Sequence, residues 1–215
     1  ESKTLLSDHI KWVKFSGASW SPDNKGFYYS AYDAPKEGVY SAQNTNQKVY
    51  YHRIGTSQSE DILIYADPTN PLHYFHGGES EDGKWQFITT QAGTSGTQIL
   101  YKRTSERKWR ILFKGFEYDY YILDCYKDEI FVMTNDSAPN YRLVGVNLNT
   151  GKQYDIIPER EDLLESVGMA GDYLFAEYLI DAQNKVFQYD RKGNPVRAVE
   201  LPIIGSVGGV DGERE

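Results

Sequence analysis

Three residues of the sequence have the types and spacing that could bind a metal ion. His73, His76 and Glu79 follow one another at intervals of three, and two histidines with one carboxylate and an open position are typical of catalytic zinc. On a helix this spacing would bring the three side chains together, but the neighbouring residues are typical of strand and loop, and Gly77 and Gly78 interrupt the pattern. We therefore interpret these histidines as loop residues and expect neither a metal nor another cofactor.

A second pattern has the letters of a phosphate-binding loop. Residues 78–84 read G-x-x-x-x-G-K, but Trp85 follows where the magnesium-binding Ser or Thr should stand, and no helix is expected after it. Three acidic residues within the segment (Glu79, Glu81 and Asp82) would repel phosphate. The sequence therefore predicts a hairpin turn at this position.

The sequence evidence for a catalytic nucleophile is equally weak. Ser19 and Ser95 lie in Gly-x-Ser settings that both miss the Gly-x-Ser-x-Gly pattern of α/β-hydrolases, and neither is followed by a helix-like run. Cys125, the single cysteine, excludes an internal disulfide and is expected to be a buried structural thiol. No residue of this chain can be chosen as catalytic from its sequence context.

Composition limits the partners and the fold class. The 215 residues contain 23 basic and 31 acidic side chains, a net charge of −8, which argues against nucleic acid or an anionic membrane surface as a partner. No window approaches the ~20 apolar residues of a membrane span, and no signal peptide is visible. The 18 Tyr, 9 Phe and 4 Trp, separated by turn-forming residues, favour an all-β chain.

Short alternating runs recur in sets along the whole chain. We expect strands at 27–32, 48–54, 61–65, 84–90, 98–102, 109–113, 120–125, 129–134, 141–147, 154–157, 166–170, 172–178, 185–189 and 196–201. The third strands of the four sets contain Val49, Ile99, Leu143 and Val186, which are 50, 44 and 43 positions apart. Units of four antiparallel strands that repeat every ~40–50 residues are typical of β-propeller blades.

The repeat predicts one partial propeller domain over residues 1–215. Its approximate blades are 13–68, 73–115, 119–157 and 163–202, and residues 205–215 should begin a further blade. Pro158 and the acidic residues after it predict a short helix over 158–165, between two blades. Because the pattern stops inside a repeat, we expect a piece of a longer propeller, whose open ends should cause self-association.

Three stretches resemble one family, the prolyl oligopeptidases. Residues 13–32 resemble the start of a blade in that family, and residues 137–143 resemble the third strand of a later blade. Residues 46–61 are the most similar, with paired tyrosines, His52, an aliphatic-Gly-Thr turn and the run Gln58-Ser59-Glu60-Asp61. The resemblance covers nearly the whole chain in the right order.

This resemblance implies a seven-bladed propeller joined to an α/β-hydrolase domain with a Ser-His-Asp site that cleaves short peptides after proline. The partners would be proline-containing oligopeptides and the parent protein's own hydrolase domain. The chain would be the middle of the propeller, inactive by itself, and the compartment stays open between cytoplasm and periplasm. Two alternatives are a non-enzymatic interaction propeller of the translocation type and a related peptidase that cleaves after basic residues; Gln58–Asp61 favours the proline-specific branch over the latter.

The resemblance also suggests substrate-binding residues. Tyr74 and Phe75, in the loop that enters the second blade, and Thr94, after that blade's second strand, match positions that face the substrate cavity in the family. The family often has Met and Cys side chains at these places, and this chain does not. The other interpretation of all three residues is ordinary loop packing.

Overall fold

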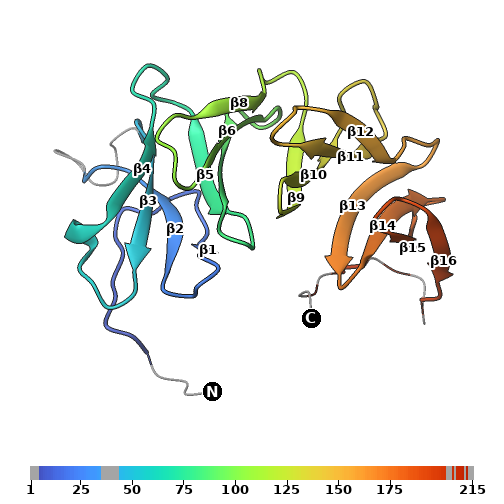
Figure 1. The fold of residues 1–215 in the computed structure, drawn as a ribbon, viewed down its shortest axis with the longest axis horizontal. Helices are drawn as coiled ribbons and strands as arrows, with labels where there is room; N and C mark the ends of the chain where they lie inside the picture. Colours follow the sequence, from blue (N-terminus) through green and yellow to red (C-terminus); the bar gives the residue numbers. More distant parts are fainter. Residues whose placement is uncertain (1–4, 35–43, 202–204, 206, 211, 213–215) are drawn as a thin grey trace. The chain divides into compact units, whose positions relative to one another are not determined.

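The chain folds into four antiparallel sheets of four strands each. The computed structural model describes residues 5–34, 44–201, 205, 207–210 and 212, and Figure 1 shows their strands in chain order. They form two compact units, Glu1–Glu117 and Tyr118–Glu215, each of which holds two sheets. The all-β fold predicted from the aromatic and turn-forming residues is confirmed.

In the first unit, each sheet is a meander of neighbouring strands. The first sheet contains β1 (Ser19–Trp20), β2 (Gly26–Ala31), β3 (Lys48–Arg53) and β4 (Ile62–Ala66). The second contains β5 (Tyr74–Glu79), β6 (Trp85–Gln91), β7 (Gln98–Arg103) and β8 (Arg110–Phe113). Because neighbouring strands are antiparallel, β5 and β7 begin at one end of the second sheet, which we call the Tyr74 end, and β5 finishes at the opposite Glu79 end.

The second unit repeats this arrangement. Its first sheet contains β9 (Tyr120–Tyr126), β10 (Glu129–Thr134), β11 (Arg142–Asn147) and β12 (Gln153–Ile157). Its second contains β13 (Leu163–Ala170), β14 (Tyr173–Ile180), β15 (Gln183–Asp190) and β16 (Pro195–Val199).

The predicted repeat is confirmed at the level of single strands. Val49, Ile99, Leu143 and Val186 lie on β3, β7, β11 and β15, the third strand of each sheet. All four side chains are buried, because the third strand is internal to its sheet and packs on both faces. Cys125 is also buried on β9, as predicted.

The helix predicted over 158–165 is wrong. Only residues 158–162 separate β12 from β13, and they are not helical. Asn140 holds them in place: its side-chain Nδ2 donates to the carbonyl oxygens of Arg160 and Glu161, while its backbone N–H donates to Glu159 Oε1 at 2.7 Å. These bonds occupy backbone groups that a helix would need, so a contact between strand connections overrides the local helix signal.

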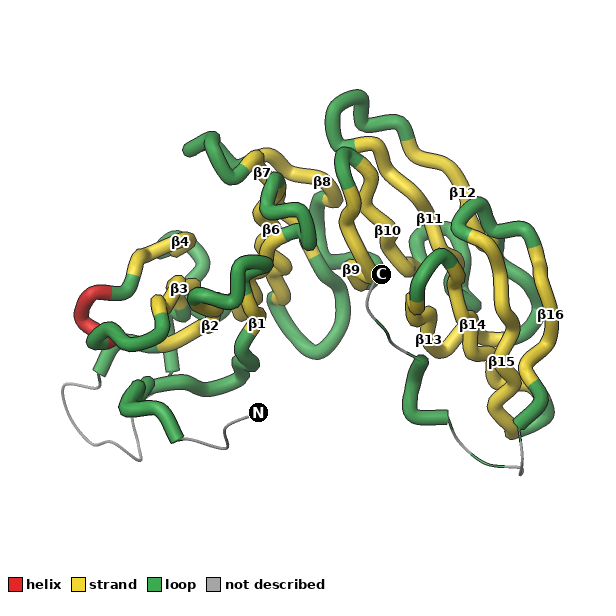
Figure 2. The backbone as a smooth tube through the Cα atoms, turned by 60° about the horizontal axis from the view of Figure 1, so that its bottom comes forward, coloured by secondary structure: helices red, strands yellow, loops and turns green. Residues whose placement is uncertain are grey.

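The only helix among the described residues is a 3-10 turn, η1 (Gln58–Glu60), which Figure 2 shows in red between β3 and β4. Ser57 and Glu60 form a capping box, in which the Ser57 N–H donates to Glu60 Oε2 at 2.9 Å. No described helix is long and apolar enough to span a membrane.

Strand β5 is a strand that the sequence did not predict. Gly77 and Gly78, which argued for a loop, lie inside it and pair with Ile88 and Phe87 of β6. His76 and Glu79 are three apart on this strand, so their side chains leave opposite faces of the sheet. Residues of β1 were likewise not expected as a strand.

Each unit is held together by an apolar core between its two sheets. In the first unit, Phe75 of β5 is fully buried with Val49, Ile88 and Leu100. In the second unit the core draws on all strands from β10 to β14 and contains Phe131, Leu143, Ile156, Ile157, Leu164, Val167, Met169, Leu174, Ala176 and Tyr178. Burying one large apolar side chain contributes about 1.5–3 kcal/mol, so these clusters are the main reason that neighbouring sheets stay in contact.

The end of the chain was expected to start a further blade at 205–215, and part of that range lies outside the described residues. The described part runs beside β13. The Gly212 N–H donates to the Met169 carbonyl at 3.0 Å, and Val210 O comes so close to Gly168 that an added Cβ would lie 1.5 Å from it.

Gly77 is a position where the two sheets of the first unit approach closely, and it gives a test of this packing. A Cβ added at Gly77 would lie 2.4 Å from Cγ1 of Val49, a stiff and fully buried side chain. We expect Gly77→Ala to lower the free energy of unfolding of this unit by about 1–3 kcal/mol, measured by urea unfolding. Gly17→Ala is the control, because an added Cβ there meets nothing within 4 Å. Equal stability of both variants would contradict this packing.

Candidate peptide-binding face

The three residues expected to bind substrate lie at the same end of the second sheet. Tyr74 begins β5 and pairs with Gln91 of β6, and Thr94 lies in the loop that follows β6. Thr94 is exposed and Tyr74 is half-buried. Phe75 is different: its side chain is fully buried in the core with Val49, so it supports the strand and is not available to a ligand.

An exposed aromatic residue that sequence reasoning did not single out lies against Tyr74. The Phe15 ring meets the Tyr74 ring edge-on, with centroids 5.5 Å apart, and Phe15 is 63% exposed. Tyr32 lies next to the same segment, because its backbone N–H donates to the Trp12 carbonyl at 3.1 Å; burial and the nearby Tyr74 hydroxyl both raise the pKa of Tyr32. We call Phe15, Tyr32 and Tyr74 the aromatic cluster.

The segment that carries Phe15 has a strained backbone and is not a strand. Trp12 and Phe15 have φ angles of 61° and 54°, in the left-handed region that bulky residues avoid. Such a conformation costs on the order of 1–3 kcal/mol and persists only when the surroundings fix it. The only sequence feature that pointed to this irregular segment was an aromatic residue beside Ser16-Gly17.

Gln47 fixes the strained segment to the start of β5. Its side-chain Nε2 donates to the Lys14 carbonyl at 3.0 Å, and its Oε1 accepts from the Phe75 N–H at 2.7 Å. Gln47 is 1% exposed, and its bond to Phe75 is buried, whereas the bond to Lys14 is partly buried. The amide therefore sets the distance between the segment that carries Phe15 and the strand that carries Tyr74.

Two serines complete this connection. Ser16 Oγ accepts from the Ser30 N–H at 2.8 Å, and Ser30 Oγ donates to the Phe75 carbonyl at 2.5 Å. Both backbone groups of Phe75 are thus held by side chains of the first sheet. The aromatic cluster is therefore positioned by the first and second sheets together.

The Thr94 loop is shaped by a glycine. Gly96 has a φ of +78°, and a Cβ there would lie 1.9 Å from the carbonyl oxygen of Phe116. The Phe116 ring packs on His73 with centroids 5.1 Å apart. This contact connects the loop to the residue that precedes Tyr74, and it leaves residues 92–95 exposed at the Tyr74 end.

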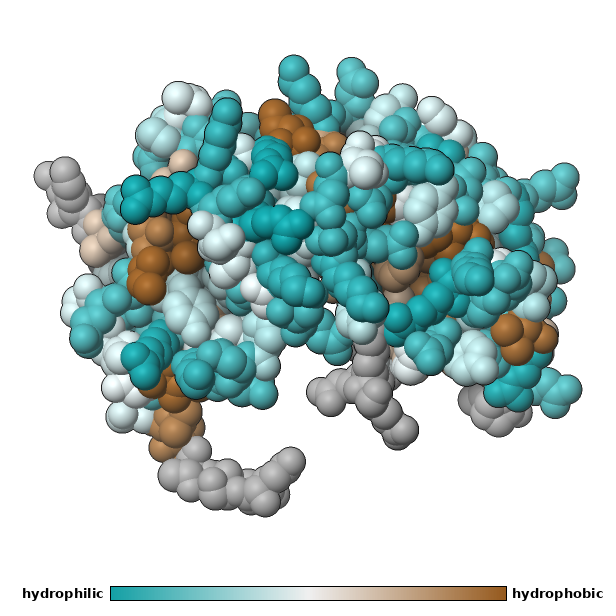
Figure 3. Space-filling model, in the orientation of Figure 1, coloured by the Kyte–Doolittle hydropathy of each residue, from teal (hydrophilic) through white to brown (hydrophobic). Residues whose placement is uncertain are grey.

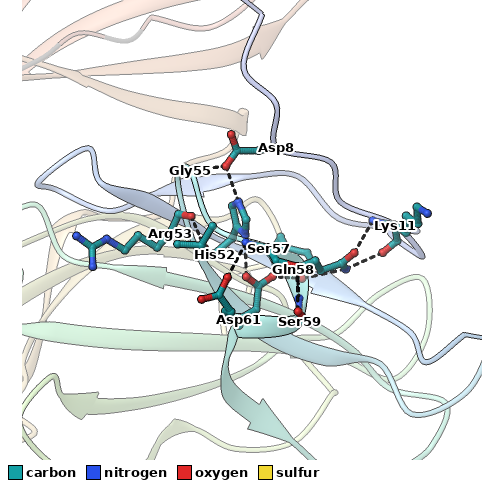
Figure 4. A network of polar contacts seen from close by, with 12 residues as sticks. Asp8, Lys11, His52, Arg53, Gly55, Ser57, Gln58, Ser59 and Asp61 are labelled. Atoms are coloured by element: carbon teal, nitrogen blue, oxygen red, sulfur yellow. Dashed lines mark hydrogen bonds and ion pairs between the residues drawn. The ribbon is translucent and has the colours of Figure 1, made fainter.

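A buried network secures the other end of the N-terminal segment, and Figure 4 shows it in detail. His52 is fully buried, with Nδ1 2.7 Å from Asp61 Oδ1 and Nε2 3.0 Å from Asp8 Oδ1. Asp8 also accepts from the Gly55 N–H at 2.5 Å, and Tyr29 donates to Asp61 Oδ2 at 2.6 Å. We call residues 8–16 the N-terminal strap, because it is pinned at Asp8 and again at Lys14 and Ser16.

Gln58 of η1 attaches the strap at one more residue, Lys11. Its side-chain Oε1 accepts from the Lys11 N–H at 3.0 Å, and its Nε2 donates to the Lys11 carbonyl at 3.1 Å. His52, Gln58 and Asp61 all belong to the stretch that most resembles the prolyl oligopeptidases. That stretch therefore anchors the strap that carries Phe15.

Comparison with known proteins gives consistent results along the whole chain. A family model described as the prolyl oligopeptidase N-terminal β-propeller domain matches residues 1–215. A prolyl endopeptidase of Elizabethkingia miricola is 36% identical over all of this chain and 31% of its own length. The chain thus spans about a third of such relatives.

Solved structures agree with the sequence comparison. A structure from a study of two prolyl endopeptidases has a TM-score of 0.87 and 35% identity, over 97% of this chain and 30% of that one. Prolyl oligopeptidase B of Galerina marginata, solved with a 35mer hydrolysis and macrocyclization substrate, has a TM-score of 0.86 and 28% identity, over 94% of this chain and 29% of that one.

Substitution of Gln47 tests whether its amide holds the site. Gln47→Leu would leave the Phe75 N–H buried without this partner, and an unpaired buried group costs about 1–3 kcal/mol. We expect a clear fall in the urea midpoint of the first unit. The same substitution at the exposed Gln153 should change little. A Gln47→Leu protein as stable as the Gln153→Leu control would show that the bridge is dispensable.

The His52 network predicts a pH dependence of stability. Burial alone would lower the pKa of His52, but its hydrogen bonds to Asp8 and Asp61 outweigh this effect and raise the pKa above the ordinary value of 6.5. A raised folded-state pKa gives stability that is complete below the unfolded value and is lost as pH rises through the folded one. We therefore expect the melting temperature to fall as pH increases from 6.5 towards 9.

Two His→Gln variants test this assignment, one at His52 and a control at His9. His52→Gln should remove the alkaline fall in melting temperature, whereas His9→Gln should keep it. A wild-type melting temperature that does not change over this pH range would refute the assignment of His52 as a charged group in the folded state.

Proposed function

Because the chain belongs to the prolyl oligopeptidase family, as its N-terminal β-propeller domain, we propose that it is the propeller part of a serine endopeptidase that cleaves short peptides after proline. The Ser that attacks the peptide carbonyl, the His that acts as general base and acid, and the Asp that orients the His would belong to an α/β-hydrolase domain. The role of this chain would be to cover that site and admit short, proline-containing peptides.

The aromatic cluster carries this proposal. Proline presents a rigid, apolar ring, and aromatic side chains are the usual surface on which such segments dock. Phe15 and Tyr74 offer edge-on rings at the Tyr74 end, and the exposed Thr94 adds a hydroxyl in the loop at the same end of the sheet. We assign peptide contact to Phe15, Tyr74 and Thr94, and we assign Phe75 to the support of β5.

We further propose that the sheets are consecutive blades of a seven-bladed propeller. The blades would be residues 13–68, 73–115, 119–157 and 163–202, with 205–215 as the start of the next. The packing of Val210 and Gly212 beside β13 supports this extension, because the first strand of a following blade would lie next to the first strand of this one.

The two alternative functions are not favoured. The matched relatives are prolyl endopeptidases, which fits neither an interaction scaffold nor a peptidase specific for basic residues. The run Gln58–Asp61, which distinguished these branches in the sequence, has a structural role here as η1 and part of the His52 network.

Cleavage by the full-length protein tests the proposal. The substrates are chromogenic peptides that end in Gly-Pro or in Arg, each with and without a serine-reactive phosphonate. We expect release after proline that the phosphonate abolishes. Release after Arg alone would place the protein with the basic-residue peptidases, and no release from either substrate would indicate a binding propeller.

Single substitutions in the aromatic cluster should weaken catalysis without abolishing it. An aromatic contact contributes about 0.5–1.5 kcal/mol, so Phe15→Ala or Tyr74→Ala should lower kcat/KM for a Gly-Pro substrate about 2- to 10-fold. Tyr173→Ala, an exposed aromatic residue on β14, is the matched control and should leave kcat/KM unchanged. If all three variants lost activity equally, peptide contact by the cluster would be disproved.

We also propose that the 215-residue chain associates with itself when it is separated from the rest of the protein. The outer strands β4, β8 and β16 carry exposed Ile62, Leu63, Ile111 and Val196, and Figure 3 shows apolar patches on one face among hydrophilic residues. Unpaired strand edges pair readily with other chains. Light scattering at increasing concentration should show oligomers, and a strict monomer would contradict the proposal.

A further inference from the structure

A cavity lies at the Glu79 end of β5, the end opposite the aromatic cluster. It has a volume of about 580 Å³ and lies between the two sheets of the first unit, within the size range of small-molecule sites. Its lining comes from the β1–β2 hairpin, strands β2, β3 and β4, the end of β5, and the start of β6. The proposed peptidase function makes no use of it.

The charge of the cavity wall is negative. Four carboxylates line it, from Asp23, Glu79, Glu81 and Asp82, and none of the described residues that line it is basic. Two of the four already have cations beside them: Lys25 is 3.2 Å from Asp23, and Lys84 is 2.9 Å from Asp82.

Glu79 differs from those two in its partners. The Tyr28 hydroxyl donates to it at 3.1 Å, and Thr104 Oγ1 lies 3.3 Å away but gives its one proton to the Gly83 carbonyl at 2.7 Å; both hydroxyls are neutral groups. Burial raises the pKa of Glu79, although the positive charge of Lys102 acts in the opposite direction. Its carboxylate is therefore poorly solvated at the cavity wall, and a cation of the right size would compensate it.

Gln86 provides a second acceptor on the same wall. Tyr28 has one hydroxyl proton, which it donates to Glu79, so Gln86 must donate to Tyr28 through Nε2, at 3.0 Å. This orientation leaves Gln86 Oε1 without a donor among the described residues, although Gln86 is only 7% exposed. Oε1 is itself buried, so a ligand would reach it after a rotation of the amide towards the cavity.

The remaining walls are apolar. The Tyr28 and Tyr51 rings lie 5.1 Å apart, and Ile62 and Ile64 of β4 also line the cavity. A group with several N–H donors would satisfy Glu79 and Gln86, and an alkyl stem would cover the apolar wall. Alkyl ammonium and guanidinium ions combine both features, whereas a hydrated metal ion would not use the apolar surface.

We propose that this cavity binds an organic cation, an ammonium or guanidinium group on an apolar stem, with Glu79 as its counter-ion and Gln86 as a second acceptor. The cation can belong to a free amine or to a basic side chain of a peptide. The site is separate from the aromatic cluster, so cation binding and peptide cleavage are independent properties.

The test is a calorimetric titration of the full-length protein with butylammonium chloride and with butylguanidinium chloride. We expect both cations to bind and the neutral 1-butanol not to bind. A titration with acetyl-Gly-Lys-Gly-amide distinguishes the sources: binding shows that a peptide side chain can reach the site, and binding of the free cations alone identifies a small amine. If none of the three cations binds, the proposal is wrong.

Two carboxylate variants test whether the cation binds at Glu79. Glu79→Gln should weaken butylammonium binding about tenfold or more, because it removes the charge that the cation meets. Glu117→Gln, an exposed carboxylate outside the cavity, makes the same change in net charge and should leave the affinity unchanged. Equal affinity of these two variants would overturn the proposal.

A measurement on the wild-type protein covers the case in which Glu79→Gln does not fold. Isoleucine methyl signals of Ile62 and Ile64 should shift on addition of butylammonium, because both residues line the cavity, while those of the exposed Ile111 on β8 should not. Shifts confined to Ile111, or no shifts, would contradict the assigned position.

Discussion

Every strand arrangement in this protein depends on one constraint: a four-stranded sheet has two apolar faces, and each must be covered by a neighbouring sheet. In the first unit, Phe75 meets Val49 in a fully buried contact, and Gly77 lets β5 approach close enough for it. In the second unit, a larger cluster does the same between β10–β12 and β13–β14. Backbone hydrogen bonds form each sheet, but apolar burial holds adjacent sheets together.

The candidate site is a consequence of that packing. Once Phe75 is buried, its backbone N–H and carbonyl lie beside the first sheet, where Gln47 and Ser30 bind them. Gln47 then holds the strap through Lys14, and the strap presents Phe15 against Tyr74. The strain in the strap is thus balanced by partly buried hydrogen bonds at one end and by the His52 network at the other.

Strands and their repeat were predictable because alternation and turn residues are local signals, and Val49, Ile99, Leu143 and Val186 all lie where the period placed them. The features that failed depend on contacts distant in sequence. Asn140 prevents the helix after Pro158, and β5 contains glycines because another sheet approaches it. The resemblance pointed to Tyr74 and Thr94, which lie at one end of the second sheet, but alternation alone could not show that Phe75 points into the core, or that Phe15 lies against Tyr74.

The central claim is that the Tyr74 end faces the peptide. The most direct measurement is photo-crosslinking of the full-length protein with a proline-containing peptide that carries a benzophenone, followed by mass spectrometric mapping. The account predicts crosslinks on Phe15, Tyr74 or the loop 92–97, which an excess of unlabelled peptide removes. Crosslinks at the Glu79 end of the first unit, or none on this chain, would contradict it.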